Sequence, residues 1–185
     1  SPNFLLHAEE PATSETPERL SDYELASRLS FFLWCSIPDD ELMKLASEGK
    51  LHDPTVLNQQ VDRMLDTSFG SHRSDIHKHA MLAENFMGQW LGTRDLGTRL
   101  KPDTTIFSGY DYEIEFALKQ EPADFFEYML TENKSLLDLI DSDYTFMARE
   151  TVDYYDLSGK VKIKGWGQVH RVDLPEDSHR GGVLG

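Results

Sequence analysis

The sequence contains repeated segments that begin with a helix-capping residue and continue with apolar residues three or four positions apart. This pattern is typical of amphipathic helices, and it constrains the fold class more than any other feature of the sequence. The clearest is Ser21-Asp22-Tyr23-Glu24, a capping box in which the Ser21 side chain accepts the Glu24 amide hydrogen and the Glu24 carboxylate accepts the Ser21 amide hydrogen. Apolar residues follow it at helical spacing. The pattern predicts a first helix over about residues 21–35.

The same signals predict further helices. Acidic residues after Pro38 lie where the positive end of a helix dipole favours them, and Gly49 ends that helix. Asp53 and Pro54 suit the N-cap and the first helical position of the next. Pro122 lies inside a later helical pattern and is expected to kink or divide it. We therefore expect helices over about residues 38–49, 54–65, 73–91, 111–133 and 146–156, with a short capped turn at 136–140.

The last thirty residues change character, because apolar and polar residues alternate among glycines, which predicts one or two strands. The expected fold class is therefore mainly α, an irregular helical bundle of five to seven helices with a small C-terminal β element. Residues 1–20 are expected to form an N-terminal extension and linker, and residues 21–158 the helical domain. Residues 159–185 would form the small β element, which we interpret as the start of the next domain of a longer protein.

The net charge of the chain and its apolar runs indicate which classes of partner are not expected. The chain has 18 Lys and Arg residues against 33 Asp and Glu residues, for a formal net charge of −15. The basic residues are scattered singly, so nucleic acid is not an expected partner. No apolar run approaches the roughly 20 residues that span a bilayer, so membrane insertion is not expected either.

The single cysteine, Cys35, excludes both an internal disulfide and a Cys-x-x-Cys-His haem attachment within the chain. No cofactor is therefore expected within this chain. Apolar neighbours surround Cys35 in the sequence, which predicts a buried thiol with a structural role.

One cluster could bind a metal. If a helix already runs through His72, then His72, Asp75 and His79 lie on one face, where two imidazoles and a carboxylate could hold a divalent ion. The spacing differs from the usual metal-binding pattern of histidines four residues apart. The alternative, a polar and exposed helix start, is favoured because Arg73 and Lys78 mark the segment as solvated.

A second candidate metal site begins at Asp141 and Asp143, which resemble the start of a calcium loop. Such a loop needs Gly at its sixth position and Glu at its twelfth, where this chain has Phe146 and Val152. Helix capping is the favoured interpretation, and an irregular calcium site is the alternative.

Other candidates have simple structural explanations. Carboxylates occur in close pairs, as a glycosidase requires, but 33 acidic residues produce such pairs by chance. The aromatic stripe around Phe86 and Trp90 could bind a cofactor or a sugar, although core packing is the favoured interpretation. Arg180-Gly181-Gly182 could form an anion-binding nest or a simple turn. No nucleophile elbow or phosphate-binding loop is present, so the catalytic residues, if any, are unknown. The carboxylate pairs are Asp39 with Asp40, Glu113 with Glu115, and Glu121 with Asp124.

Several segments together resemble one family: residues 20–34, 38–42, 84–91, 143–146 and 180–185. They are similar to the central domain of unknown function of large planctomycete-type secreted proteins, which often carry a cytochrome c haem domain elsewhere. The resemblance implies a periplasmic or extracellular location, haem c elsewhere in the parent protein, and a parent that continues beyond this chain. It supplies no catalytic residues.

Two functions remain open. The preferred one is a noncatalytic helical module that scaffolds or docks other domains of the same parent protein. The alternative is part of a secreted redox enzyme, or of a metal-assisted hydrolase acting on extracellular polymers. A scaffold should present apolar faces at the two ends of this segment and no convergent polar pocket, whereas an enzyme should have a concave site with several titratable groups turned inward.

Overall fold

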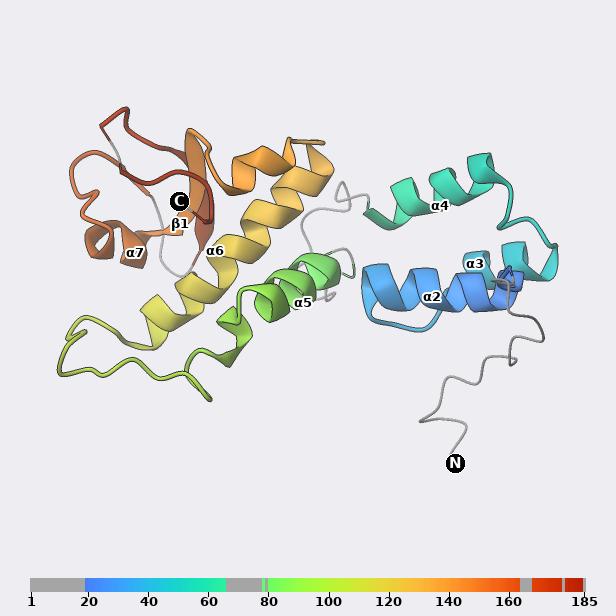
Figure 1. Ribbon diagram of the computed structural model, residues 1–185, viewed down its shortest axis with the longest axis horizontal. Helices are drawn as coiled ribbons and strands as arrows, with labels where there is room; N and C mark the ends of the chain where they lie inside the picture. The colour runs from blue at the N-terminus through green and yellow to red at the C-terminus, as the bar shows by residue number, and fades with distance from the viewer. Residues whose placement is uncertain (1–18, 66–77, 79, 164–167, 178, 185) are drawn as a thin grey trace. The chain divides into compact units, whose positions relative to one another are not determined.

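The computed structural model describes residues 19–65, 78, 80–163, 168–177 and 179–184 (Figure 1). Within these ranges the chain forms six α-helices and one two-stranded antiparallel sheet near the C-terminus, which confirms the expected mainly α fold. The chain divides into two compact units, Ser1–Asp66 (unit 1) and Thr67–Gly185 (unit 2). No described helix is both long enough and apolar enough to cross a membrane.

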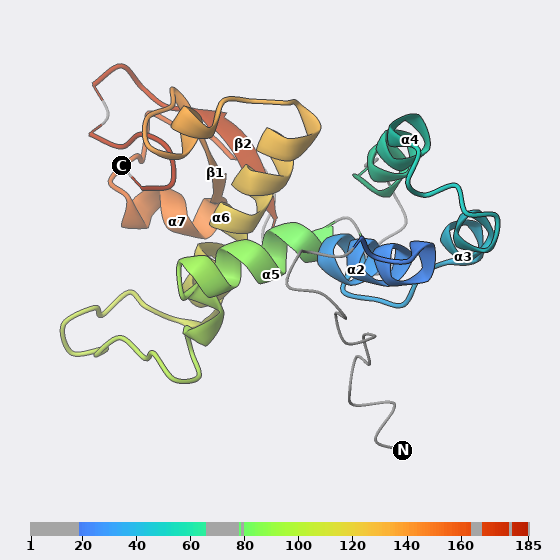
Figure 2. The same cartoon turned by 45° about the vertical axis from the view of Figure 1, so that its right-hand side comes forward.

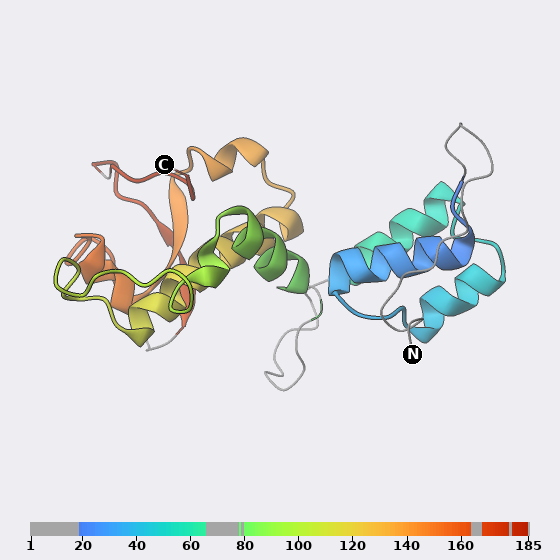
Figure 3. The same cartoon turned by 60° about the horizontal axis from the view of Figure 1, so that its bottom comes forward.

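Unit 1 consists of three short helices, α2 (Asp22–Trp34), α3 (Asp40–Ser47) and α4 (Pro54–Leu65). Helix α2 packs against both of the others (Figure 3). The Trp34 indole N–H donates to the Met64 carbonyl oxygen at 2.9 Å, which joins the end of α2 to α4. The core of this unit is formed by small and aliphatic side chains, including Ala26, Leu33, Leu42, Leu51 and Met64.

The predicted helix caps of unit 1 are confirmed. The Ser21 amide donates to Glu24 Oε2 at 2.7 Å, and the Glu24 amide donates to Ser21 Oγ at 3.3 Å. Asp53, the predicted N-cap of α4, accepts the Thr55 amide hydrogen at 2.8 Å. Asp39, for which the sequence indicated only a place at the start of a helix, caps α3 by accepting the Leu42 amide hydrogen at 2.9 Å. Gly49 has φ +65°, the left-handed backbone that commonly follows a helix.

The predicted burial of Cys35 is wrong. Helix α2 ends at Trp34, and Cys35 is its C-cap in the left-handed conformation, with φ 50°. This turn leaves Cys35 exposed, while Leu33 occupies the buried position. The apolar neighbours in the sequence therefore do not cover the thiol.

Unit 2 is built around two helices that pack together, α5 (Ala80–Trp90) and α6 (Tyr112–Thr131). Strands β1 (Tyr144–Ala148) and β2 (Val169–Asp173) pair antiparallel, and both contact α6 (Figure 2). Short 3-10 turns, η1 (Thr93–Asp95) and η2 (Leu136–Leu139), follow the two helices. The core lies between α5, α6 and β1 and contains Met87, Phe125, Met129, Leu139 and Tyr144.

The predicted helix over 146–156 is partly wrong. Residues 144–148 form β1, and only Arg149–Tyr154 form a helix, α7. The reason is tertiary, because Ala148 pairs with Val169 and Tyr144 pairs with Asp173, so the partners of this strand lie far along the chain. Local spacing cannot reveal such partners.

Helix α6 runs without interruption through Pro122, so the expected division of the helix is wrong, and the alternative, a kink at Pro122, stays a prediction. Proline removes one backbone donor, whose hydrogen bond a helix interior normally needs. Here Pro122 is buried, and the next turn places Ala123, Phe125 and Met129 in the core. Packing on both sides of the proline stabilises a continuous helix.

Candidate functional site

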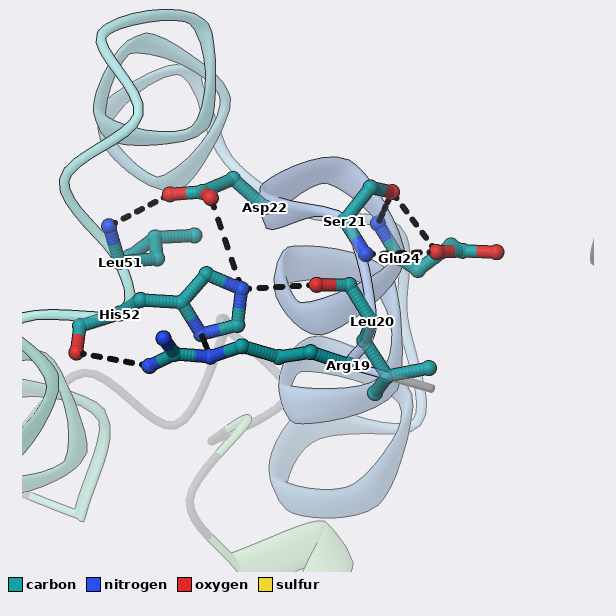
Figure 4. A network of polar contacts seen from close by, with 7 residues as sticks. All are labelled: Arg19, Leu20, Ser21, Asp22, Glu24, Leu51 and His52. Atoms are coloured by element: carbon teal, nitrogen blue, oxygen red, sulfur yellow. Dashed lines mark hydrogen bonds and ion pairs between the residues drawn. The ribbon is translucent and has the colours of Figure 1, made fainter. Parts of the chain in front are cut away.

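A network of polar contacts joins the start of α2 to the turn before α4 (Figure 4). The Leu51 amide donates to Asp22 Oδ2 at 2.7 Å, and His52 Nε2 lies 2.7 Å from the Leu20 carbonyl oxygen. Arg19 Nε donates to His52 Nδ1 at 3.1 Å. A carbonyl only accepts, so the ring hydrogen belongs on Nε2 and both ring nitrogens are engaged. His52 therefore serves to tie two segments of unit 1 together.

The predicted metal site of His72, Asp75 and His79 lies outside the residues that the structure describes, and it stays a prediction. In the described ranges, no three or more His, Cys, Asp or Glu side chains come together in a group that could hold a metal ion.

Asp141 and Asp143, the second predicted metal site, lie in the turn before β1. The Asp141 amide donates to the Leu137 carbonyl at 3.0 Å, and the Asp143 carbonyl accepts from the Leu174 amide at 2.8 Å. These backbone contacts anchor the turn beside the sheet. The irregular calcium site stays a prediction.

In two of the three candidate carboxylate pairs, one carboxylate forms an ion pair with a basic side chain. Asp39 forms an ion pair with Arg63, at 2.7 Å between Oδ2 and a guanidinium nitrogen. Glu115 accepts from the Lys119 ammonium at 2.8 Å, and this contact is the largest cause of the lowered pKa of Glu115. Both carboxylates stabilise helices or helix contacts.

The third pair differs, because Glu121 of α6 lines a cavity of about 270 Å³ within unit 2. Glu121 Oε2 accepts from the Tyr155 hydroxyl at 2.6 Å, and Oε1 accepts from the Thr151 hydroxyl at 2.9 Å. The guanidinium carbon of Arg180 lies 3.7 Å from the centroid of the Tyr155 ring. Three distant segments of the chain thus bring a carboxyl group, a phenol and a guanidinium to one cavity.

The remaining lining of this cavity is mainly apolar. Two threonine hydroxyls are added by Thr93 of η1 and Thr145 of β1. The apolar lining residues are Leu91, Leu118, Pro122 and Val183. Polar and apolar groups therefore line the cavity in similar measure, and such a combination can hold a small molecule.

The electrostatics of the cavity suit proton transfer. Burial raises the pKa of Glu121 from 4.5 to about 7, although hydrogen bonds from Tyr155 and Thr151 and the charge of Arg180 act in the opposite direction. Burial and the neighbouring Glu121 raise the pKa of Tyr155. A carboxyl group that titrates near neutral pH can both donate and accept a proton, which is the requirement for general acid–base chemistry.

Asp124, the partner of Glu121 in the predicted pair, lies one turn further along α6. Burial raises the pKa of Asp124 from 3.8 to about 7, and the charges of Glu127 and Glu84 add to the effect. Burial also raises the pKa of Glu84 on α5. Unit 2 therefore contains two carboxyl groups, three positions apart on one helix, that titrate near neutral pH.

Two candidate sites remain, the aromatic stripe around Phe86 and Trp90 and the segment Arg180-Gly181-Gly182. Phe86 and Trp90 are 44% and 51% exposed, so the core interpretation is wrong for both side chains. Phe86 still contacts Phe126, with ring centroids 5.2 Å apart. The Gly182 amide donates to Ser142 Oγ at 3.1 Å, so this amide serves the fold.

Sequence reasoning missed Tyr155 and Thr151. They lie 34 and 30 residues from Glu121, and neither belongs to a recognisable motif. Glu121 and Arg180 were both candidates, but nothing in the sequence connected them. The fold of unit 2 brings Glu121 and Arg180 to the same cavity.

A larger depression of about 890 Å³, also in unit 2, is lined by both charged and apolar residues, and two of the charged residues have clear structural roles. Asp111 caps α6 by accepting from the Ile114 amide at 2.9 Å. Asp153 accepts a hydrogen bond from the Ser158 hydroxyl. This depression is a weaker candidate than the cavity of Glu121.

The chain matches a known protein family. The family described as PSD4, protein of unknown function (DUF1592), matches residues 20–157. No curated protein and no solved structure matches the chain.

Proposed function

This chain belongs to the DUF1592 family, and we propose that it is a helical docking module for another domain of the same polypeptide. The parent protein is proposed to be exported to the periplasm or cell surface and to carry haem c in another domain. This context rests on the family resemblance of the sequence.

The observation that carries the docking function is the exposure of three large aliphatic side chains around η2. Leu136, Leu137 and Ile140 are 72%, 71% and 58% exposed. Single exposed apolar residues are normal on protein surfaces, but three together on one turn favour an interaction site. Burying each would contribute about 1.5–3 kcal/mol to association.

The turn that presents these side chains is held in place. Leu139, the last residue of η2, is buried in the core of unit 2. The Tyr144 hydroxyl donates to Asp138 Oδ2 at 2.8 Å, and the amides of Val183 and Leu184 both donate to the Leu139 carbonyl at 2.9 Å. A preorganised surface loses little entropy on binding, which supports a docking function.

A second copy of the chain is a poor occupant for this surface. Each copy has a formal net charge of −15, so two copies repel each other. A different domain of the parent polypeptide, tethered at high effective concentration, suits the surface better.

The test compares hydrogen exchange in this chain and in the intact parent protein. The amides of residues 135–140 should exchange at least about tenfold more slowly in the parent, which corresponds to about 1.4 kcal/mol. The double substitution Leu136→Asp and Leu137→Asp should abolish the difference. Ile106→Asp is the matched control, because Ile106 is also 72% exposed but lies in a different loop. Equal exchange in the two proteins would contradict the docking function.

The second candidate function is part of a secreted redox enzyme or of a metal-assisted hydrolase. It is favoured by the convergence of Glu121, Tyr155 and Arg180 on one cavity, a feature that a pure scaffold does not need. The two functions are compatible, because the docking surface and the cavity use different side chains.

A further inference from the structure

We infer that the domain docking at η2 presents an apolar site bordered by lysine or arginine side chains. The inference rests on the proposed docking function and names the chemistry of the partner. Three features of unit 2 carry it: the extent of the exposed apolar surface, the acidic side chains beside that surface, and the contacts that the nearby basic side chains already make.

The docking surface includes a fourth aliphatic side chain, Leu184 of the C-terminal segment. Leu184 is 51% exposed, and its amide donates to the Leu139 carbonyl oxygen at 2.9 Å, which holds the residue beside η2. Gly182 has φ +62°, and a Cβ there would lie 2.5 Å from the same carbonyl oxygen, so only glycine allows this close approach. The docking surface therefore consists of four exposed aliphatic side chains from two segments of the chain: Leu136, Leu137, Ile140 and Leu184.

Acidic side chains border this surface. Asp141 directly follows Ile140, and its amide donates to the Leu137 carbonyl oxygen at 3.0 Å. Asp143 lies in the same turn before β1, and both aspartates are exposed. In the described ranges, neither carboxylate forms an ion pair with a basic side chain. Residues 132–143 contain four acidic residues and one basic residue, so the segment around η2 has a formal charge of −3.

The basic side chains of this part of unit 2 make contacts elsewhere. The Lys134 ammonium lies over the Tyr128 ring, 5.6 Å from its centroid. The Arg171 guanidinium lies over the Tyr144 ring at 4.8 Å. The Arg180 guanidinium lies over the phenol ring that borders the cavity, at 3.7 Å. The negative charge beside the docking surface is therefore available to a partner.

A partner with basic side chains around an apolar centre fits both parts of this surface. Its apolar residues would cover the four aliphatic side chains, and its lysine or arginine side chains would lie beside Asp141 and Asp143. An acidic rim would repel the two carboxylates, and an apolar rim would remove water from them without giving them a partner. An apolar centre with a polar rim is also the usual arrangement of a protein interface. The apolar side chains would hold the partner, and the charges would select it.

The test measures hydrogen exchange of residues 135–140 in the isolated chain and in the intact parent protein, at about 0.02 M and about 0.5 M salt. Docking slows exchange in the parent. A basic rim predicts that this slowing is at least about threefold smaller at the higher salt concentration, because salt screens exposed charges. A chelator is present throughout, so that a cation bound by Asp141 and Asp143 cannot neutralise them.

The double substitution Asp141→Asn and Asp143→Asn removes both charges and keeps the size of the side chains. The parent protein carrying it should show the smaller slowing already at low salt, with little further change at high salt. Glu113→Gln with Asp156→Asn is the matched control, because both residues are exposed in unit 2 and the change in net charge is the same. Glu113 lies in the first turn of α6 and Asp156 lies after α7, so the control should keep the salt dependence of the wild type.

The outcomes separate the partner chemistry from the docking function. Slowing in the parent that is equal at both salt concentrations would overturn the basic rim and leave docking at η2 intact. Equal exchange in the isolated chain and the parent would contradict docking itself, and the inference with it. Equal effects of the two double substitutions would assign the salt response to the net charge of the chain and would overturn the inference. Exchange of the α6 amides reports whether unit 2 is folded in each variant.

Discussion

Replacing Glu121 by glutamine should make unit 2 less sensitive to rising pH. Glutamine keeps the shape and one acceptor oxygen of the side chain but removes its ionisation. In the folded protein the pKa of Glu121 is raised from 4.5 to about 7 by burial. The folded state therefore binds this proton more tightly than the unfolded state, and its contribution to stability is complete below pH 4.5 and is lost as the pH rises through 7.

The size of the effect follows from the two pKa values. Between pH 5 and pH 8 the wild-type chain should lose about 2–3 kcal/mol of unfolding free energy through Glu121 alone. The Glu121→Gln chain should not lose this amount. The difference in unfolding free energy between the two chains should therefore change by about 2–3 kcal/mol in favour of the variant across this range.

Urea unfolding at pH 5, 6, 7 and 8 measures this difference, and hydrogen exchange of α6 peptides assigns it to unit 2. Glu115→Gln is the matched control on the same helix, because Lys119 lowers the pKa of Glu115. The control chain should keep the full loss of stability caused by Glu121. A difference between wild type and Glu121→Gln that stays constant with pH, within about 0.5 kcal/mol, would refute the reasoning.

Four further substitutions or reactions test the fold. Ser21→Ala should lower the unfolding free energy of unit 1 by about 1 kcal/mol, through loss of the capping box, as measured by urea unfolding. His52→Ala should lower it by about 1–3 kcal/mol, because the Leu20 carbonyl loses its partner. Phe125→Ala should cost unit 2 about 3–5 kcal/mol, since the buried ring stacks on Tyr144 at 5.1 Å. Cys35 should react with a thiol reagent in the native protein as fast as in the unfolded chain, because it is exposed.

Local signals in the sequence predicted the helix starts well, and the physical reason is that caps involve residues only three positions apart. Ser21 with Glu24, and Asp53, cap the helices they were expected to cap, and Asp39 caps the helix that its acidic segment was expected to begin. Gly49 adopts the left-handed backbone expected after a helix. These features depend on the chain within one turn, so the sequence contains all of the relevant information.

Features that depend on distant residues could not be predicted in the same way. Strand β1 exists because Ala148 and its neighbours pair with β2, and α6 tolerates Pro122 because the flanking turns are buried. Glu121 and Arg180 were single candidates in the sequence, and only the tertiary fold brings them to one cavity with Tyr155. A candidate site whose residues lie far apart in the sequence can be identified only from the tertiary structure.

The most direct test of the cavity is the pKa of Glu121 itself, measured by NMR titration of its carboxyl carbon in the wild-type chain and in Arg180→Gln. A midpoint near pH 7 is expected, and it should rise further in the variant, because the charge of Arg180 lowers the pKa of this group. A midpoint near 4.5 that does not respond to Arg180→Gln would mean that Glu121 is solvated and that the carboxyl, phenol and guanidinium groups do not converge.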